Sequence, residues 1–205
     1  MRGGIATPRM IILVPATIEP IEPDHTFRTE HTETRRGDNW LVLAATFFAA
    51  AVLIHGADHA RRGAGAVSRD VFWAGTAAIL LEVALVVLAC QRHRLAPVIA
   101  AVGGFSLAIG YAVVHFLPHR SWLSDSFTSA MHASPLSWTA ASLEVTAAIT
   151  LGVVGVVTLR QRGGIAAVSR PKPDQRALGQ GIVHPVALAM IVGNVAILAI
   201  SVTQL

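Results

Sequence analysis

The sequence predicts an all-α membrane protein, a polytopic bundle of transmembrane helices. Of the 205 residues, 53% are hydrophobic and only 14% are charged, whereas a soluble domain carries about 25% charged residues. The hydrophobic residues are also gathered in blocks rather than spread at amphipathic spacing. Blocks of about 20 residues are long enough for a helix to cross the ~30 Å hydrocarbon core of a bilayer. We therefore expect the lipid bilayer, and not water, to surround most of the chain.

The blocks predict five spans, at about residues 40–59, 71–90, 95–117, 138–159 and 182–203. Trp40 and Trp138 open two of them, as is typical of residues at a membrane interface. Pro118 ends the third, because proline lacks the backbone N–H that a continuing helix needs.

The polar segments between the blocks divide the chain into four parts. Residues 1–38 contain four prolines and mixed charges without a sustained period, so we expect a disordered cytoplasmic tail there. The remaining parts are a four-helix bundle at 39–159, a cytoplasmic linker at 160–181 and a fifth transmembrane helix at 182–205.

The four-helix part has an internal pattern that predicts a duplicated two-helix hairpin, with repeats at about 40–90 and 95–159. Each repeat has two histidines four residues apart, then an arginine, and a Leu-Glu-Val tripeptide in the next helix. The members of the pattern are His55, His59 and Glu82 in the first repeat and His115, His119 and Glu144 in the second. Two repeats of the same orientation predict a pseudo-twofold axis along the membrane normal.

The distribution of Lys and Arg predicts the orientation of the chain. Twelve of these residues fall in the tail, in the 91–94 loop and in the linker, and four fall on the other side. Basic residues are enriched in cytoplasmic loops, so we expect the N-terminus in the cytoplasm and the C-terminus outside. The Arg-, Ala- and Gly-rich composition is typical of a GC-rich bacterial genome, which places the protein in a bacterial plasma (inner) membrane. Because the arginines lie at helix ends and form no basic face, we expect no nucleic acid partner.

The two histidine pairs are the candidate metal or haem ligands. Side chains four residues apart share one helix face about 6 Å apart, so both rings of a pair can reach one ion. We therefore predict that His55, His59, His115 and His119 converge near the outer face. Such a cluster suits Zn²⁺, copper or iron, and a haem held by one histidine from each of two helices is the alternative cofactor. Pro118 lies between the second pair and disturbs its helical spacing.

Carboxylates are expected around this cluster as a further ligand or as groups that orient the rings. The candidates are Asp58, Asp125 and Glu144. Tyr111, one turn before the second pair, is expected to donate a hydrogen bond into the cluster. The loop that carries Asp125 either covers the bundle or lies at the interface with Phe127 among the lipid headgroups, and we favour the second alternative.

Glu82 is expected near the membrane midplane, about 16 Å from the outer boundary at the helical rise per residue. A charged carboxylate costs on the order of 3 kcal/mol there, so both glutamates of the repeat should point into the bundle.

The sequence contains no residue set that predicts an enzyme. It has no phosphate-binding glycine loop and no nucleophile elbow, and its single cysteine, Cys90, excludes a cysteine-based metal site within one chain. The histidine pairs resemble those of integral-membrane hydroxylases and metal-dependent lipid hydrolases, but these families need more histidines or another order of ligands. The leading hypothesis is a membrane protein that binds a metal ion or haem.

Three alternatives stay open. In the first, the histidines are simply solvated at the membrane interface. In the second, the chain is a structural or assembly subunit that packs against other membrane subunits through Gly103, Gly104 and Gly110. In the third, it is a proton- or ion-coupled transporter that uses Glu82 and Glu144.

Overall fold

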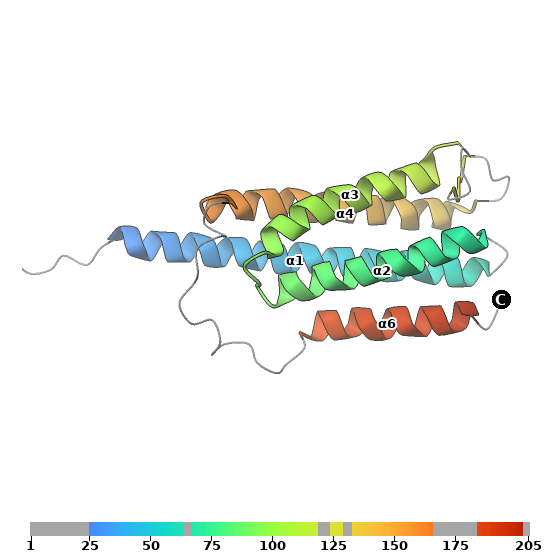
Figure 1. Ribbon diagram of the computed structural model, residues 1–205, viewed down its shortest axis with the longest axis horizontal. Coiled ribbons are helices and arrows are strands. Elements are labelled where there is room, and N and C mark those ends of the chain that lie inside the picture. The colour runs from blue at the N-terminus through green and yellow to red at the C-terminus, as the bar shows by residue number, and fades with distance from the viewer. Residues whose placement is uncertain (1–24, 64–66, 119–123, 129–132, 166–183, 203–205) are drawn as a thin grey trace, which may run out of the picture.

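The described part of the protein is entirely helical. The computed structural model describes residues 25–63, 67–118, 124–128, 133–165 and 184–202. The helices within these ranges are α1 (His25–Arg62), α2 (Arg69–Cys90), α3 (Ala96–Phe116), α4 (Pro135–Gln161) and α6 (Pro185–Val202) (Figure 1). All five are long and apolar enough to cross a membrane. The predicted all-α chain with five apolar spans is therefore confirmed.

Local sequence signals explain where α2, α3 and α4 begin and end. The Ser68 hydroxyl accepts a hydrogen bond from the Val71 amide at 3.2 Å, and the Ser134 hydroxyl accepts one from the Ser137 amide, also at 3.2 Å. Each serine thus satisfies one of the free amides at a helix N-terminus. At its other end α3 stops at Phe116, two residues before Pro118.

The first helix begins earlier than the sequence suggested, at His25 rather than near residue 40. Contacts with the end of α4 hold residues just before the apolar block in place. Thr158 donates a hydrogen bond to the Gly37 carbonyl at 3.3 Å, and Arg162 forms an ion pair with Asp38. Residues 1–24 of the predicted tail (1–38) and residues 166–181 of the predicted linker (160–181) lie outside the described residues. Residues 25–38 of that tail belong to α1.

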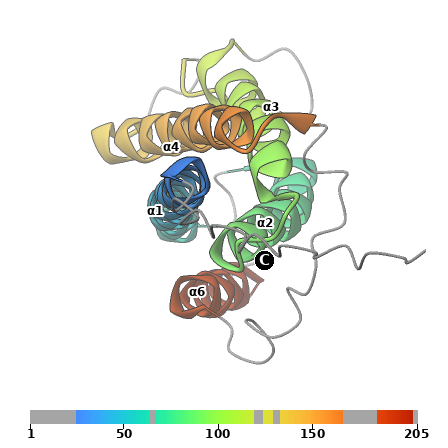
Figure 2. The same ribbon diagram turned by 90° about the vertical axis from the view of Figure 1, so that its left-hand side faces the viewer.

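The helices α1, α2, α3 and α4 form a closed ring of neighbours, and α6 packs outside the ring against α1 and α2 (Figure 2). The helices α1, α3 and α6 run in one direction, while α2 and α4 run in the other. The C-terminal ends of α1 and α3 and the N-terminal ends of α2 and α4 therefore meet at one end of the bundle, and side chains from four helices can converge there.

The closest packing in the ring joins α3 to α4, where small residues let the two backbones touch. A Cβ atom added at Gly104 would lie 2.6 Å from the Gly152 nitrogen, and one added at Gly155 would lie 2.6 Å from the Ala101 nitrogen. Small residues at helix contacts are typical of membrane bundles. This contact sets the position of Glu144 on α4 relative to His115 on α3.

Candidate metal centre

Three of the four predicted histidines meet at the end of the bundle where α1 and α3 finish. His55 and His59 occupy the last two turns of α1, and His115 lies in the last turn of α3. One ring nitrogen from each of the three residues can be chosen so that all lie within 4.8 Å of one another. The fourth predicted ligand, His119, lies outside the described residues.

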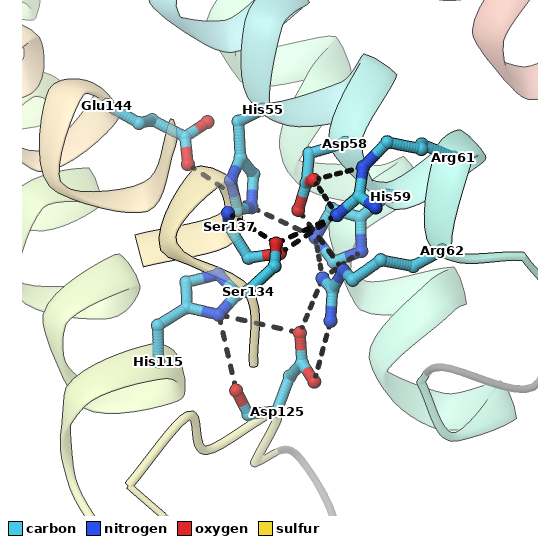
Figure 3. Close-up of polar contacts among 10 residues, drawn as sticks. All are labelled: His55, Asp58, His59, Arg61, Arg62, His115, Asp125, Ser134, Ser137 and Glu144. Atoms are coloured by element: carbon cyan, nitrogen blue, oxygen red, sulfur yellow. Dashed lines mark hydrogen bonds and ion pairs between the residues drawn. The ribbon is translucent and has the colours of Figure 1, made fainter. Parts of the chain in front are cut away.

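The three rings are packed against one another inside the protein (Figure 3). The centroids of His55 and His59 are 4.5 Å apart, those of His55 and His115 4.8 Å apart, and those of His59 and His115 6.0 Å apart. His55 and His115 are only 6% and 4% exposed. Rings that were merely solvated at a membrane interface would be exposed, so the first of the three alternatives does not fit these two.

Glu144 on α4 brings a carboxylate to the cluster. Its Oε2 atom lies 3.6 Å from the His55 Nε2 atom, and the residue is 3% exposed. Oε2 has no hydrogen-bond partner among the described residues. A buried carboxylate oxygen without a partner costs free energy, and a cation bound between this oxygen and the imidazoles would remove that cost.

Asp125, in the segment between α3 and α4, orients the ring of His115. The Nδ1 atom of His115 lies 3.4 Å from the backbone oxygen of Asp125 and 3.6 Å from its Oδ2 atom. An Nδ1 proton directed at these oxygens leaves Nε2 as the free lone pair. A ring whose second nitrogen donates to a carboxylate or carbonyl is the usual arrangement of histidine ligands of metal ions.

Phe127 covers this side of the cluster, contrary to the expectation that it lies among headgroups. It is 3% exposed, and its ring centroid is 4.9 Å from that of His115 and 5.6 Å from that of Trp138. Its amide also donates a hydrogen bond to the His115 carbonyl at 2.9 Å. This segment folds back over the bundle because its aromatic side chain has a buried partner there.

Asp58 does not join the imidazoles but forms a layer of paired charges beside them. Its carboxylate is 2.7 Å from Arg61 and 3.2 Å from Arg62. Arg62 also contacts the Asp125 carboxylate at 3.0 Å, and Arg61 donates to the hydroxyls of Ser134 at 3.0 Å and Ser137 at 3.3 Å. Two arginines thus balance two aspartates, and the layer adds no net charge to the cluster.

The hydrogen bonds assign the tautomers of the two histidines on α1. Arg62 donates to the His59 Nδ1 atom at 2.9 Å. A neutral His59 therefore carries its proton on Nε2, which lies 2.9 Å from the His55 Nε2 atom and donates to it. His55 already presents a lone pair on Nε2. His59 must lose or move its Nε2 proton before that nitrogen can bind a cation. Arg62, which donates to His59 now, remains held by Asp58 and Asp125 after this change.

Tyr111 donates its hydrogen bond to Glu82 rather than to the histidines, which corrects the prediction for this residue. The contact joins α3 to α2. Glu82 is 3% exposed, and its Oε2 atom has no hydrogen-bond partner among the described residues. Both glutamates of the proposed repeat therefore point into the bundle, as expected.

A cavity of about 310 Å³ adjoins the cluster, between α1, α2, α3 and α6. The three histidines, Glu82, Tyr111 and Glu144 all contribute to its wall, and most of the other lining residues are apolar. Apolar pockets with a few convergent polar groups are typical of ligand-binding sites.

Sequence reasoning missed the two arginines and the serines of the charged layer. Arg61 and Arg62 follow Asp58 by three and four residues, which is the spacing of ion pairs on a helix, so this signal was available. Ser134 and Ser137 come from a helix 70 or more residues away in the chain, and no local pattern links them to α1.

Comparisons of the chain with protein-family models, with curated protein sequences and with solved structures give no match.

Proposed function

We propose that this chain is an integral protein of a bacterial plasma membrane that binds a single Zn²⁺, copper or iron ion with His55, His59, His115 and Glu144. The observation that carries the proposal is the convergence of three imidazole nitrogens within 4.8 Å of one another. With the cytoplasmic N-terminus that the arginine distribution predicts, the centre faces the outer side of the membrane.

The donor set favours a transition metal over Mg²⁺ or Ca²⁺, because imidazole is a preferred ligand of zinc, copper and iron, while Mg²⁺ and Ca²⁺ prefer oxygen. Tetrahedral ligands at about 2.1 Å from zinc lie about 3.4 Å from each other. The three ring nitrogens lie up to 4.8 Å from one another, which is farther apart than zinc ligands are. The side chains must therefore move by on the order of 1 Å when an ion binds.

The charges around the cluster also favour a cation. The arginines and aspartates beside it neutralise each other, whereas Glu82 and Glu144 have no Lys or Arg partner in the described part of the chain. Both of these glutamates are almost fully buried. A divalent ion in the same region offsets two carboxylate charges that are otherwise costly at this depth.

The geometry supports a compact ion better than a haem. A haem ligated by two histidines holds the rings on opposite faces of its macrocycle. Here His55 and His115 meet edge to face with centroids 4.8 Å apart, and the two rings on α1 are joined by a hydrogen bond of 2.9 Å. No pair of these rings leaves space for a porphyrin between its members.

The centre supports the proposal that the bundle arose from a duplicated hairpin. The first repeat would contribute His55 and His59, and the second His115 and Glu144. In each repeat the first helix carries the histidines and the second the glutamate.

A bundle packed in this way also uses its own small residues: a Cβ atom added at Gly103 would lie 2.8 Å from the Leu85 side chain of the same chain. That contact weakens the case for an assembly subunit that presents Gly103 and Gly104 to a partner.

Elemental analysis of purified protein tests the proposal. The protein should be purified through a tag without histidines, placed in lipid nanodiscs, equilibrated with Zn²⁺, Cu²⁺ or Fe²⁺ and desalted. We expect about one ion per chain. The ion should be lost in His55→Ala and in His115→Ala. It should be retained in the control His184→Ala, which alters a histidine at the opposite end of the bundle. Folded protein that holds no ion, or holds it equally in all variants, would refute the proposal.

A further inference from the structure

The cavity beside the cluster extends well beyond the groups that could hold an ion. Its volume is about 310 Å³, within the lower range of small-molecule pockets, and far more than one ion needs. Apolar side chains from α1, α2, α3 and α6 form most of its wall, including Val52, Ile79, Leu107 and Ile197.

Three buried oxygen atoms on the residues that line this cavity have no hydrogen-bond partner among the described residues. They are Oε2 of Glu82, Oε2 of Glu144 and Oδ1 of Asn194. The three residues are 3%, 3% and 5% exposed. Nearly all buried polar atoms in folded proteins have a partner. The proposed ion accounts for the Glu144 oxygen, and the oxygens of Glu82 and Asn194 then indicate a missing hydrogen-bond donor. The terminal torsions of Glu and Asn side chains are soft, so each oxygen can turn towards a molecule in the cavity.

Asn194 gives the firmest indication because it stands apart from the proposed metal centre. It lies on α6, and its amide nitrogen donates to the Met190 carbonyl of its own helix at 2.9 Å, which identifies the remaining atom as the acceptor oxygen. A polar side chain in an apolar helix normally bonds to a neighbouring helix. The Asn194 oxygen has no such bond to any residue that the structure describes, and Asn194 belongs to the wall of the cavity.

Two glycines keep the apolar part of the cavity open. Gly75 on α2 and Gly110 on α3 both line it at exposed positions, and a Cβ atom added at either would have no atom of the described residues within 4 Å. No neighbouring helix blocks a larger residue at either position, and we expect such a residue to reduce the space for a bound molecule.

We propose that this cavity binds an apolar molecule from the bilayer that carries a hydroxyl group, with the hydroxyl donating to the Oδ1 atom of Asn194 and the apolar body between α2, α3 and α6. Two classes of membrane compound share this chemistry, isoprenoid alcohols and quinols. The inference goes beyond the proposed metal site and does not require an ion to be bound.

A binding assay with tritiated farnesol on the full chain in nanodiscs tests the inference, with scintillation proximity as the readout. We expect saturable binding that is abolished in Gly110→Leu and Gly75→Leu and retained in Ile109→Phe, which enlarges an exposed residue of α3 outside the cavity. Asn194→Leu should weaken binding by about three- to tenfold, the loss of one hydrogen bond. Monodisperse gel filtration of each variant verifies folding.

Competition distinguishes the two sources of the hydroxyl. Displacement of farnesol by decylubiquinol supports a quinol as ligand, and displacement by unlabelled farnesol alone supports an isoprenoid alcohol. Absence of saturable binding of either compound, equal competition by the hydrocarbon farnesene, or undiminished binding in folded Gly110→Leu would overturn the inference. The ion content of the same samples reports separately on the metal proposal.

Discussion

Replacing Gly104 by alanine should loosen the contact between α3 and α4 that positions the centre. The added Cβ atom would lie 2.6 Å from the Gly152 nitrogen and 2.8 Å from the Ala148 oxygen. Ordinary contact begins at 3.4 Å, so the two helices must separate by about 0.8 Å. The obstructing atoms belong to the backbone, and no side-chain rotation can relieve the contact.

The matched control is Gly110→Ala on the same helix, where no atom of the segments that the structure describes lies within 4 Å of the added atom. Both substitutions gain the same helix propensity, about 1 kcal/mol, so this term cancels when the two variants are compared. What remains is the cost of overpacking, typically about 1–3 kcal/mol. We therefore expect the free energy of unfolding of Gly104→Ala to be lower than that of Gly110→Ala by this amount.

Unfolding by SDS in mixed micelles, followed by far-UV circular dichroism, measures this difference. Because α3 carries His115 and α4 carries Glu144, Gly104→Ala should also weaken ion binding, while Gly110→Ala should not. The reasoning is refuted if Gly104→Ala is as stable as its control.

Three further predictions concern the centre. Asp125→Asn removes the carboxylate that faces His115 and should raise the Kd for the ion by about 10- to 100-fold in a chelator competition; an unchanged Kd would contradict the role of Asp125. Glu144→Gln should raise the same Kd. Glu82→Gln removes a charge that the ion offsets but no ligand, since the Glu82 carboxylate is bonded to Tyr111, so it should raise the Kd less, and it should abolish proton flux into proteoliposomes only if the chain is a transporter. Ion occupancy, followed by equilibrium dialysis, should fall on acidification because protons compete for the imidazole nitrogens, and occupancy that is independent of pH would argue against histidine ligands.

The location of the spans could be predicted because it depends on local composition. The apolar blocks ending at Cys90 and beginning near Leu95 correspond to helices that end and begin within one residue of these positions. The start of α1 could not be predicted in this way. The helix extends from the apolar block back towards the N-terminus as far as His25. Contacts of Gly37 and Asp38 with residues at the end of α4 hold part of this extension in place.

Part of the candidate site followed from helical spacing and from the repeat. His55 and His59 share a helix face, and Glu144 was predicted as a carboxylate beside the histidines, where its side chain lies 3.6 Å from that of His55. The partners of Tyr111 and Phe127 could not be predicted, since each depends on which neighbouring helix or segment folds against it.

The sequence by itself determined that the chain has five apolar helices and that histidines and acidic residues occur at matching positions along them, because length, hydropathy and spacing are properties of each segment alone. The tertiary structure decided which helices are neighbours and that three imidazoles share one location. It also decided that a cavity lies beside them, with oxygen atoms that are unpaired within the described part of the chain. The physical reason is that these features depend on the distance between helices, which is set by small residues such as Gly104 and Gly155 at their crossings and by no periodicity within a single helix.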